Sequence, residues 1–541
     1  MVLKILLFLS FLFLLFYKTK RTLHMLQQNL YNENNRYIKW LFKTKNQFLD
    51  LDLIVIGILL VESLILYDIK YSTVIVSLVV IGFDFLLGLK WKKKIETDQN
   101  KKPLVITKRI KRLIVTTSVL YLIPVVISLF NINDLALTWK LILLSYIMIY
   151  LNPFVVFIAN IINKPIEKFV YIYYKNKAKH KLRGMTNLKI IGITGSYGKT
   201  SSKNILSDIL NVKYNALATP KNLNTDYGLM MTINNHLDIF TDIFIAEMGA
   251  YVRGEIKSLC DFVKPKYGIL TTIGTAHLES FGSEENIVKA KFELIEALPS
   301  DGFAILNGDD SKQVSYKLKN KVRTIWVGIN NNDVDIRAFN IKYTYRGTSF
   351  DVMFKNDKKT YHFETKLLGE HNVYNILAGI ACGMEFGISL EELADAVKLV
   401  RPTEHRLELK KIGNFYQIDD AYNSNPVGAK NACHVLGMMN GIKIVVTPGM
   451  VELGEKEEFY NKQFGEEIAE VADYVILIGE KRTKPIYEGL LTQGFDKDKI
   501  IVFNDVREAY AFINSIYNGK DDIFALFEND LPSVNVTMEM H

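Results

Sequence analysis

The chain of 541 residues is longer than one compact core, so we expect two or three folding units. Its formal net charge is +8, but the basic residues cluster beside apolar runs in the first third, which favours a membrane over a nucleic-acid partner. Cys260, Cys382 and Cys433 are far apart and lack metal-ligand spacing. They support neither a disulfide framework nor a zinc site, and they indicate a reducing, cytoplasmic setting for the soluble part.

The first third of the chain holds five apolar stretches, several of them close to the roughly 20 residues that a helix needs to cross a bilayer. We expect four or five transmembrane helices. Lys18, Lys20 and Arg21 follow the first stretch where a signal peptide would carry small residues, so we interpret this stretch as an anchor. A buried helix of a soluble protein is the alternative for that stretch. The stretches are Val2–Tyr17, Leu51–Tyr67, Ser72–Leu89, Leu113–Phe130 and Leu141–Ile162.

Charged loops predict how these helices are oriented. Clusters of Lys and Arg follow the first, third and fifth stretches, whereas the loops at Asp68–Tyr71 and Asn131–Thr138 hold little positive charge. The positive-inside rule then places the N-terminus outside and the large C-terminal part in the cytoplasm, where ATP is available. The expected location is the cell membrane, with several spans and membrane lipid as a partner.

From Leu188 onward, short β-rich runs alternate with amphipathic helical segments, which is typical of an α/β fold with a mostly parallel sheet. Arg401-Pro402 interrupts the helical periodicity of the preceding segment and indicates a domain boundary near Val400. The predicted strands are Leu188–Ile193, Ile243–Ala246, Tyr267–Ile273, Phe303–Leu306, Ile442–Val446, Tyr474–Ile478, Ile500–Phe503 and Ile523–Phe527.

The strongest motif is an apolar strand that runs into a glycine-bearing turn and then into a helix. Backbone N–H groups of such a turn bind phosphate oxygens, while Lys199 would neutralise the β and γ phosphates and Thr200 would bind Mg²⁺. The motif departs from the strict phosphate-loop pattern because Ile193 stands five residues before Gly198. An ordinary glycine turn is the alternative. The predicted nucleotide-binding residues here are Thr194, Gly195, Ser196, Tyr197, Gly198, Lys199, Thr200 and Ser201.

Further motifs follow this loop in a fixed order. Glu247 ends a predicted strand, where a hard oxygen ligand suits Mg²⁺, His277 follows another strand, and Lys291 lies in an Ala-Lys-Phe-Glu helix. Together with later motifs, this series resembles the Mur ligases, most closely the MurF type, which joins D-alanyl-D-alanine to a muramoyl tripeptide. The resemblance covers roughly Leu188 to Gly494. The apolar stretches predict a membrane region over 1–183. The resemblance implies a phosphate-loop-containing central ATP-binding domain over 184–400 and a Rossmann-like α/β domain over 401–541.

The resemblance implies a magnesium site with Thr200, Glu247, His277 and Lys291 as ligands. In that family Lys291 corresponds to the lysine that CO₂ carbamylates, which turns a cation into an anionic oxygen ligand. A buried lysine loses its proton more readily and so becomes able to react. Lys289, two residues away, is the second choice, and a solvated helix lysine is the alternative reading of Lys291.

The same resemblance implies roles for later residues. Asn375 would contact adenine, Arg406 would reach the phosphates across a cleft, and Asp420 would meet the ribose or the metal environment. Seen alone, these motifs would read as a helix cap and turns. The implied catalytic residues are Lys199, His277, Lys291 and Arg406. The implied substrate residues are Asn222, Asn224 and Thr225 on the acceptor side and Tyr422, Asn423 and Asn425 on the amine side.

The implied reaction transfers the γ-phosphoryl group of ATP to a substrate carboxylate, and an amine such as D-alanyl-D-alanine then attacks the acyl phosphate. Three departures leave the acceptor open between a UDP-linked muramoyl peptide, a lipid-linked one and another membrane-proximal acid. The apolar region stands in place of the UDP-sugar domain, Tyr251-Val252-Arg253 replaces an expected Asn-His, and the C-terminus lacks a lysine-glycine-serine run. A membrane-coupled phosphate-loop ATPase and a non-catalytic scaffold are the competing functions.

Overall fold

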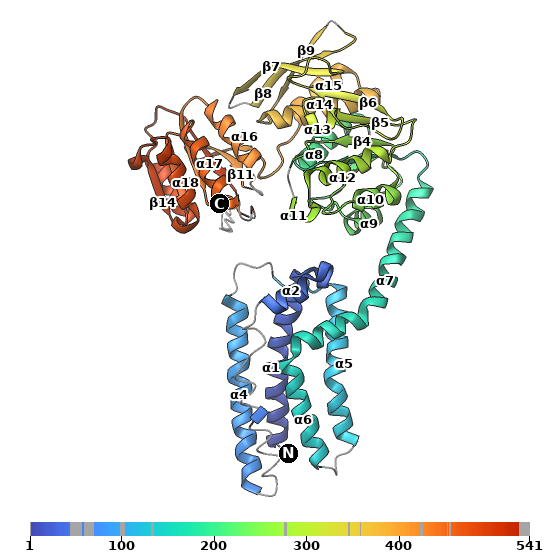
Figure 1. The fold of residues 1–541 in the computed structure, drawn as a ribbon, viewed down its shortest axis with the longest axis vertical. Helices are drawn as coiled ribbons and strands as arrows, with labels where there is room; N and C mark the ends of the chain where they lie inside the picture. The colour runs from blue at the N-terminus through green and yellow to red at the C-terminus, as the bar shows by residue number, and fades with distance from the viewer. Residues whose placement is uncertain are drawn as a thin grey trace. The chain divides into compact units, whose positions relative to one another are not determined.

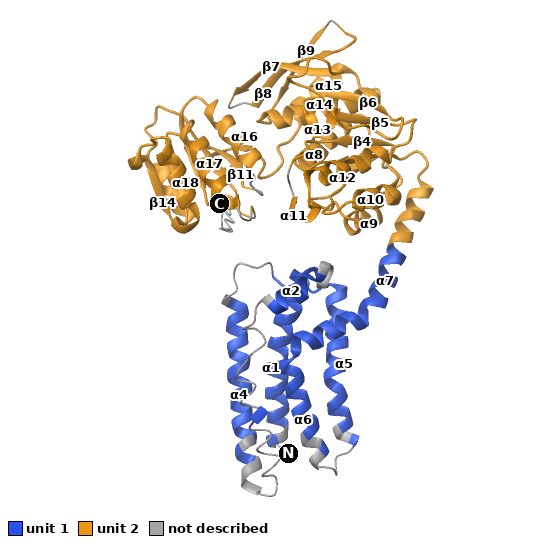
Figure 2. Cartoon of the chain, viewed as in Figure 1, with its two compact units in different colours: residues 1–174 blue, residues 175–541 orange. Residues whose placement is uncertain are grey.

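A computed structural model describes the chain in two compact units, residues 1–174 and residues 175–541, which are blue and orange in Figure 2. The predicted domain bounds at residues 183 and 400 stay predictions. The structure describes residues 2–43, 57–58, 70–97, 103–130, 135–274, 278–344, 347–357, 359–421, 426–451, 453 and 456–529.

The regular structure in the described part of the first unit is all helical. The predicted stretch Leu141–Ile162 is two helices rather than one, because α6 ends at Tyr150, α7 begins at Asn152 and the pair is bent by 84°. Pro153 stands at the start of α7, a position that proline favours because it needs no backbone donor there. The stretch Leu51–Tyr67 lies almost wholly outside the described residues. The helices are α1 (Val2–Gln28), η1 (Leu30–Asn35), α2 (Arg36–Lys43), α4 (Lys70–Thr97), α5 (Lys108–Phe130), α6 (Leu135–Tyr150) and α7 (Asn152–Gly184), the last of which continues into the second unit.

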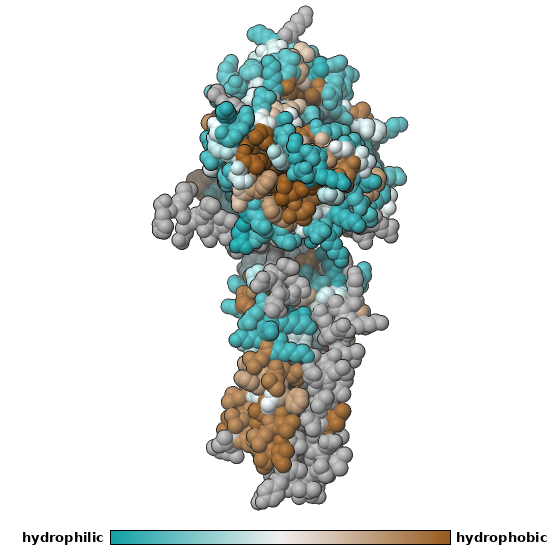
Figure 3. All heavy atoms as spheres, turned by 90° about the vertical axis from the view of Figure 1, so that its left-hand side faces the viewer, coloured by the Kyte–Doolittle hydropathy of each residue, from teal (hydrophilic) through white to brown (hydrophobic). Residues whose placement is uncertain are grey.

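Among the described helices, Lys108–Ile127 is long and apolar enough to cross a membrane, and a second crossing is counted if the bent α6 and α7 pair is one span. The predicted four or five spans are therefore not confirmed. Large apolar side chains nevertheless lie at the surface of this unit, including Phe16, Ile75, Leu86 and Val115, which are 59%, 62%, 64% and 63% exposed. Figure 3 shows hydrophobic side chains gathered on one face of the unit below a band of hydrophilic ones.

The second unit contains a nine-stranded sheet whose first seven strands run parallel and whose last two pair in antiparallel fashion (Figure 1). Ile191 and Ile193 of β1 face a core that includes side chains of α8, α14 and α15. Gly192, between them, faces the opposite side, where a Cβ atom would lie 2.5 Å from Leu294 of α12. The strands, in sheet order, are β2 (Ala216–Ala218), β3 (Ile243–Glu247), β1 (Lys189–Thr194), β4 (Tyr267–Leu270), β5 (Phe303–Asn307), β6 (Arg323–Gly328), β7 (Ile336–Thr344), β8 (Gly347–Phe354) and β9 (Thr360–Thr365).

Helices connect these strands and cover both faces of the sheet. In the capping box of α15, the Ser389 hydroxyl accepts from the backbone N–H of Glu392 and the Glu392 carboxylate accepts in return. The helices are α8 (Lys199–Leu210), α9 (Asp226–Asn235), α10 (Glu255–Val263), α11 (Leu278–Phe281), α12 (Glu284–Glu296), α13 (Ser311–Val314), α14 (Glu370–Glu385) and α15 (Leu390–Leu399).

A second, six-stranded sheet follows along the chain, with one antiparallel strand, β10, at its edge. In sheet order its strands are β10 (Glu408–Ile412), β11 (Phe415–Asp420), β15 (Ile523–Glu528), β12 (Ile442–Thr447), β13 (Tyr474–Ile478) and β14 (Ile500–Phe503). Its helices are α16 (Pro426–Gly437), α17 (Glu457–Ala469), α18 (Glu480–Thr492), η4 (Lys497–Lys499) and α19 (Val506–Ser515).

The predicted α/β architecture with mostly parallel sheets is confirmed. Most predicted strands agree with the observed ones to within one residue at either end, and the exception, Tyr267–Ile273, ends early at Leu270. The carboxyl ends of β1, β3, β4 and β5 lie at one edge of the first sheet, where open parallel sheets bind their ligands.

Candidate active site

The predicted phosphate loop connects β1, which ends at Thr194, to α8, which begins at Lys199. Gly198 has a φ of 78°, a left-handed conformation that glycine adopts without strain. At Gly195 a Cβ atom would lie 1.9 Å from the hydroxyl oxygen of Thr271, so a side chain has no room. The turn and the first N–H groups of α8 together form a concave donor surface that suits phosphate oxygens.

The segment after β4 holds this loop in place. The Thr271 hydroxyl lies 2.6 Å from the carbonyl oxygen of Tyr197, and the backbone N–H of Ser196 donates to the Thr272 carbonyl at 2.9 Å. Buried Gln313 in turn donates to the Thr271 carbonyl at 2.7 Å. The predicted strand Tyr267–Ile273 was therefore too long, because its last residues bend to support the loop instead of pairing with a neighbouring strand.

Lys199 lies against the loop that it is predicted to serve. Its Nζ donates to the carbonyl oxygens of Gly195 at 2.8 Å and Ser196 at 3.0 Å. Burial lowers the pKa of Lys199, an effect that Glu247 opposes and that the cation of Arg406 reinforces. The ammonium group thus lies at the loop that would receive the phosphates.

Glu247 ends β3 and is 1% exposed. Its carboxylate accepts from the Thr200 hydroxyl at 3.2 Å and from the side-chain amide of Asn224 at 3.1 Å. Two predicted magnesium ligands, Thr200 and Glu247, and one predicted acceptor residue, Asn224, therefore meet at one carboxylate. Hydroxyl and carboxylate oxygens are hard ligands of the kind that Mg²⁺ prefers, so these residues fit the metal.

Lys203 also contacts the Glu247 carboxylate, and this contact was not predicted from the sequence. Its Nζ lies 3.0 Å from a Glu247 carboxylate oxygen, and both side chains are 1% exposed. The same Nζ donates to the carbonyl oxygen of Lys221. The sequence offered one signal, since Lys203 stands four residues after Lys199 and therefore lies on the same face of α8.

Lys291 is 3% exposed on α12, and its Nζ lies 5.5 Å from the ring centroid of Phe281. Burial, reinforced by the nearby cation of Lys199, lowers the pKa of Lys291 to about 7. Lys289 is different, because its side chain is 40% exposed and pairs with Glu285 one helical turn earlier. The structure thus gives the buried environment to Lys291 and not to Lys289.

Several predicted residues lie outside the described part of the chain or at its surface. His277, Tyr422, Asn423 and Asn425 are outside it, so their positions stay predictions. Across the described residues, no group of three or more His, Cys, Asp or Glu side chains is placed to hold a metal ion. Asn222 is exposed in the acceptor loop, residues 221–225, which carries the three predicted acceptor residues.

A cavity lies beside the phosphate loop, and six of the predicted nucleotide-binding residues line it: Tyr197, Gly198, Ser201, Asn375, Arg406 and Asp420. Asn375 of α14 is 6% exposed, and its side-chain nitrogen has no hydrogen-bond partner among the described residues. A buried amide donor without a partner is uncommon and fits a ring nitrogen of a nucleotide base. Residues lining the cavity include Gly198, Ser201, Ser202, Thr271, Asn307, His371, Tyr374, Asn375, Arg406, Asp420 and Glu528.

Two lining residues from α14 were missed. Tyr374 donates its hydroxyl hydrogen to Asp309 at 2.7 Å, and Asp309 also accepts the backbone N–H of Ile329 at 2.6 Å, which fixes one wall of the cavity. Burial lowers the pKa of His371 to about 4, and nearby Arg406 adds to the effect. His371 is therefore neutral at neutral pH.

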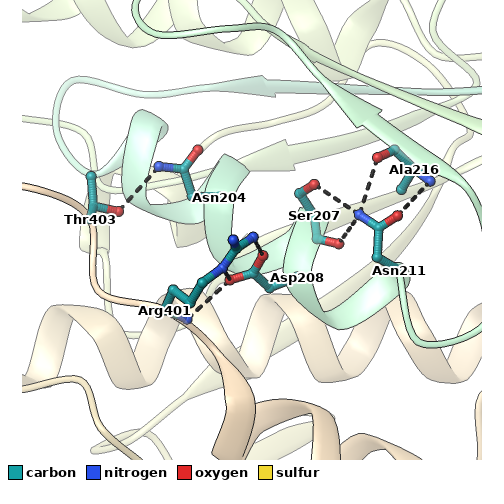
Figure 4. Close-up of polar contacts among 7 residues, drawn as sticks. All are labelled: Asn204, Ser207, Asp208, Asn211, Ala216, Arg401 and Thr403. Atoms are coloured by element: carbon teal, nitrogen blue, oxygen red, sulfur yellow. Dashed lines mark hydrogen bonds and ion pairs between the residues drawn. The ribbon is translucent and has the colours of Figure 1, made fainter.

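The chain segment that leads into the second sheet is fastened to α8. Figure 4 shows Arg401 and Asp208 facing each other, with a guanidinium nitrogen 2.7 Å from a carboxylate oxygen, and Asn204 donating to the Thr403 hydroxyl at 3.2 Å. Since α8 begins at the phosphate loop, these contacts bring Arg406 to the wall of the same cavity.

Asp420 stands at the end of β11 on the wall of the cavity. Its carboxylate accepts from the backbone N–H of Leu407 at 3.2 Å. Burial raises the pKa of Asp420, while the Leu407 N–H and the cation of Arg406 oppose the rise. The structure therefore brings together Lys199, Asn375, Arg406 and Asp420, which the sequence placed in four separate motifs.

A phosphate loop on a parallel sheet, a carboxylate at the next strand end and a second α/β sheet supplying an arginine define a nucleotide-dependent transferase or ligase. Residues 193–383 match the family model of the Mur ligase middle domain, and residues 405–526 match that of the Mur ligase glutamate ligase domain. The chain belongs to the Mur ligase family, whose members are ATP-dependent ligases.

The relatives agree with this assignment. The UDP-N-acetylmuramoyl-tripeptide--D-alanyl-D-alanine ligase of Bacillus subtilis is 34% identical over 325 residues, which are 59% of this chain and 68% of that protein. The enzyme of the same name from Escherichia coli is 31% identical over 303 residues, 56% of this chain and 66% of that one. The similarity thus spans about two thirds of these relatives.

Solved structures show the same fold. MurF from Acinetobacter baumannii superposes with a TM-score of 0.58 at 27% identity, over 66% of this chain and 77% of that one. MurF from Thermotoga maritima in complex with ADP gives a TM-score of 0.59 at 24% identity, over 66% of this chain and 80% of that one.

Proposed function

We propose that this chain is a MurF-like ligase of peptidoglycan synthesis, which uses ATP to join D-alanyl-D-alanine to the peptide carboxyl group of a muramoyl acceptor. One observation supports the proposal above others. Asn224 of the predicted acceptor loop and Thr200 of the phosphate loop donate to the same Glu247 carboxylate. The predicted acceptor residue and the predicted phosphate loop therefore lie next to each other, as transfer of a phosphoryl group between them would require.

The reaction needs an activated carboxylate, because amide formation from a free carboxylate is unfavourable in water. Phosphoryl transfer from ATP would give an acyl phosphate, and the amine would then displace inorganic phosphate. Lys199 would neutralise charge on the transferred group, Arg406 would bind the phosphates from the second sheet, and Asn375 would orient the adenine. Mg²⁺ bound by Thr200 and Glu247 would supply further positive charge at the phosphates.

We further propose that Lys291 is carbamylated by CO₂ and then offers oxygen atoms to a magnesium ion. Its burial, its lowered pKa and its lack of a hydrogen bond among the described residues support this role. A carbamate would replace a buried cation with a group that needs a cation partner, and Lys199 is close enough to influence the pKa of Lys291.

A product assay tests the function. Purified chain is incubated with ATP, magnesium, D-alanyl-D-alanine and a UDP-linked muramoyl tripeptide, and the products are identified by mass spectrometry. We expect a peptide longer by two alanines and one phosphate released per bond. Phosphate release that needs no amine would contradict the ligase and favour the membrane-coupled ATPase.

A lipid-linked acceptor is the second candidate for the same reaction. The described residues before Lys189 contain helices and no strand, whereas MurF-type enzymes begin with a soluble domain for the UDP-sugar. The assay therefore includes a lipid-linked muramoyl tripeptide beside the UDP-linked one. Equal or faster turnover of the UDP-linked acceptor would rule out a preference for lipid.

We also propose that the first unit anchors the chain in the cell membrane by several spans, with the ligase domains in the cytoplasm. The exposed apolar side chains of α1, α4 and α5 support this, because water-facing helices rarely expose so many. After cell fractionation, we expect the full chain to stay with membranes through high salt and alkaline carbonate washes. Recovery in the wash would show peripheral attachment, and recovery in the soluble fraction would contradict the anchor.

A further inference from the structure

The C-terminal end of α7 contacts the helix that follows the acceptor loop. Nζ of Lys175 lies 2.9 Å from a carboxylate oxygen of Asp226, the first residue of α9. The same Nζ lies 5.1 Å from the ring centroid of Phe262 on α10. The Lys175 and Asp226 side chains are 20% and 24% exposed, so water only partly screens the pair. This end of α7 belongs to the orange unit of Figure 2, as do α9 and α10.

Asp226 is tied to the acceptor loop, residues 221–225, by tight packing. Thr225 caps α9, since its hydroxyl oxygen accepts the backbone N–H of Gly228 at 3.3 Å. A Cβ atom at Gly228 would lie 2.6 Å from the carbonyl carbon of Leu223. Because the loop lies directly on the first turn of α9, a displacement of that turn also displaces the loop.

The other side of the acceptor loop contacts the carboxylate of Glu247, a predicted magnesium ligand. Asn224 donates to Glu247 at 3.1 Å, and its carbonyl oxygen accepts the backbone N–H of Gly249 at 2.8 Å. Lys203 donates to the carbonyl oxygen of Lys221 while it pairs with Glu247. The loop is thus held by the catalytic centre on one side and by Lys175, through Asp226, on the other.

We propose that Lys175 is a positioning residue for the acceptor loop: through Asp226 it sets how the loop presents Asn222, Asn224 and Thr225 to the muramoyl peptide. This inference rests on the proposed ligase function. α7 runs from Asn152 to Gly184, and Lys175 lies in the part of this helix that belongs to the second unit.

Steady-state kinetics of the full chain test the proposal. We expect Lys175→Met, which keeps the length of the side chain and removes its charge, to raise the KM for the muramoyl acceptor about twofold to fivefold, the range for a partly exposed ion pair. The KM for ATP should not change, because Lys175 acts on Asp226 of α9, which lies outside the phosphate loop. Lys175→Arg should restore the wild-type KM. Lys177→Met is the matched control, since Lys177 is exposed on the same helix.

A double-mutant cycle separates positioning from general destabilisation. Asp226→Asn should raise the acceptor KM in the same way, and the double variant should be no worse than the poorer single variant. Equal changes in both KM values, or additive effects, would overturn the proposal. An unchanged acceptor KM in Lys175→Met would overturn it too, whereas a wild-type chain that forms no amide bond would instead overturn the proposed function.

Discussion

Replacing Lys199 with alanine is expected to lower the rate of amide formation about 100-fold to 1,000-fold, the usual loss when one group that stabilises transferred charge is removed. In the structure its ammonium group lies within hydrogen-bonding distance of the loop carbonyls of Gly195 and Ser196. Product formation followed by mass spectrometry, together with phosphate release, measures the effect. The fold should survive, because the side chain is not part of the apolar core.

The matched control is Lys257→Ala, which removes an exposed lysine from α10 in the same unit. Its rate should stay within twofold of wild type. A Lys199→Ala variant that melts at the wild-type temperature but keeps a tenth or more of the activity would show that Lys199 does not act on the phosphoryl group.

Lys291→Ala is the second large effect that we expect, with nearly complete loss of product and partial recovery in millimolar formate or acetate. A small carboxylate can enter the space left by the lysine and offer the oxygen atoms that the carbamate would supply. Lys289→Ala is the matched control, because the Lys289 side chain is partly exposed and pairs with Glu285 on the same helix. Full activity of Lys291→Ala, without any response to carboxylate, would remove the carbamate from the mechanism.

The pH dependence of carbamylation follows from the lowered pKa of Lys291, which is about 7. Only the neutral amine reacts with CO₂, and its fraction rises as the pH increases through that value. At fixed dissolved CO₂, wild-type activity should therefore increase between about pH 6 and pH 8. The carboxylate-rescued alanine variant should lack that increase.

Local sequence patterns predicted the two parallel sheets well. Runs such as Tyr474–Ile478 and Ile500–Phe503 are continuous apolar segments bounded by polar ones, and the structure reproduces both. The antiparallel pairing of β7, β8 and β9 was not predicted. Alternating side chains such as those of Ile336–Thr344 are typical of a strand but do not show which strand it pairs with. Pairing depends on contacts far apart in the chain.

The candidate site was predictable where chemistry depends on a local motif and not where it depends on burial. The loop around Lys199 and the strand-end Glu247 follow from spacing alone. Lys203 could not be identified, since a helix lysine is usually solvated, and only the packed structure shows it beside Glu247. The same holds for Gln313, whose role comes from the bend after β4.

The transmembrane prediction shows a different limit. Hydropathy identified apolar stretches, but the break between Tyr150 and Asn152 turns one stretch into two helices, and a proline at the start of the second explains why. Composition gives the number of apolar residues. It does not give the direction in which a helix continues.

The contacts between α8 and the segment from Arg401 to Thr403 limit where the chain can bend if the second sheet moves. If the second sheet rotates towards the nucleotide, the pivot must lie after Thr403. Arg406 stands three residues further on, which at full extension is at most about 11 Å. Displacement during rotation grows with the distance from the pivot. Arg406 would therefore move little, whereas β13 and β14 would move much further. The Arg406 guanidinium would then stay close to the phosphate loop throughout the rotation. The larger movement of the second sheet would act on the side where the amine is predicted to bind.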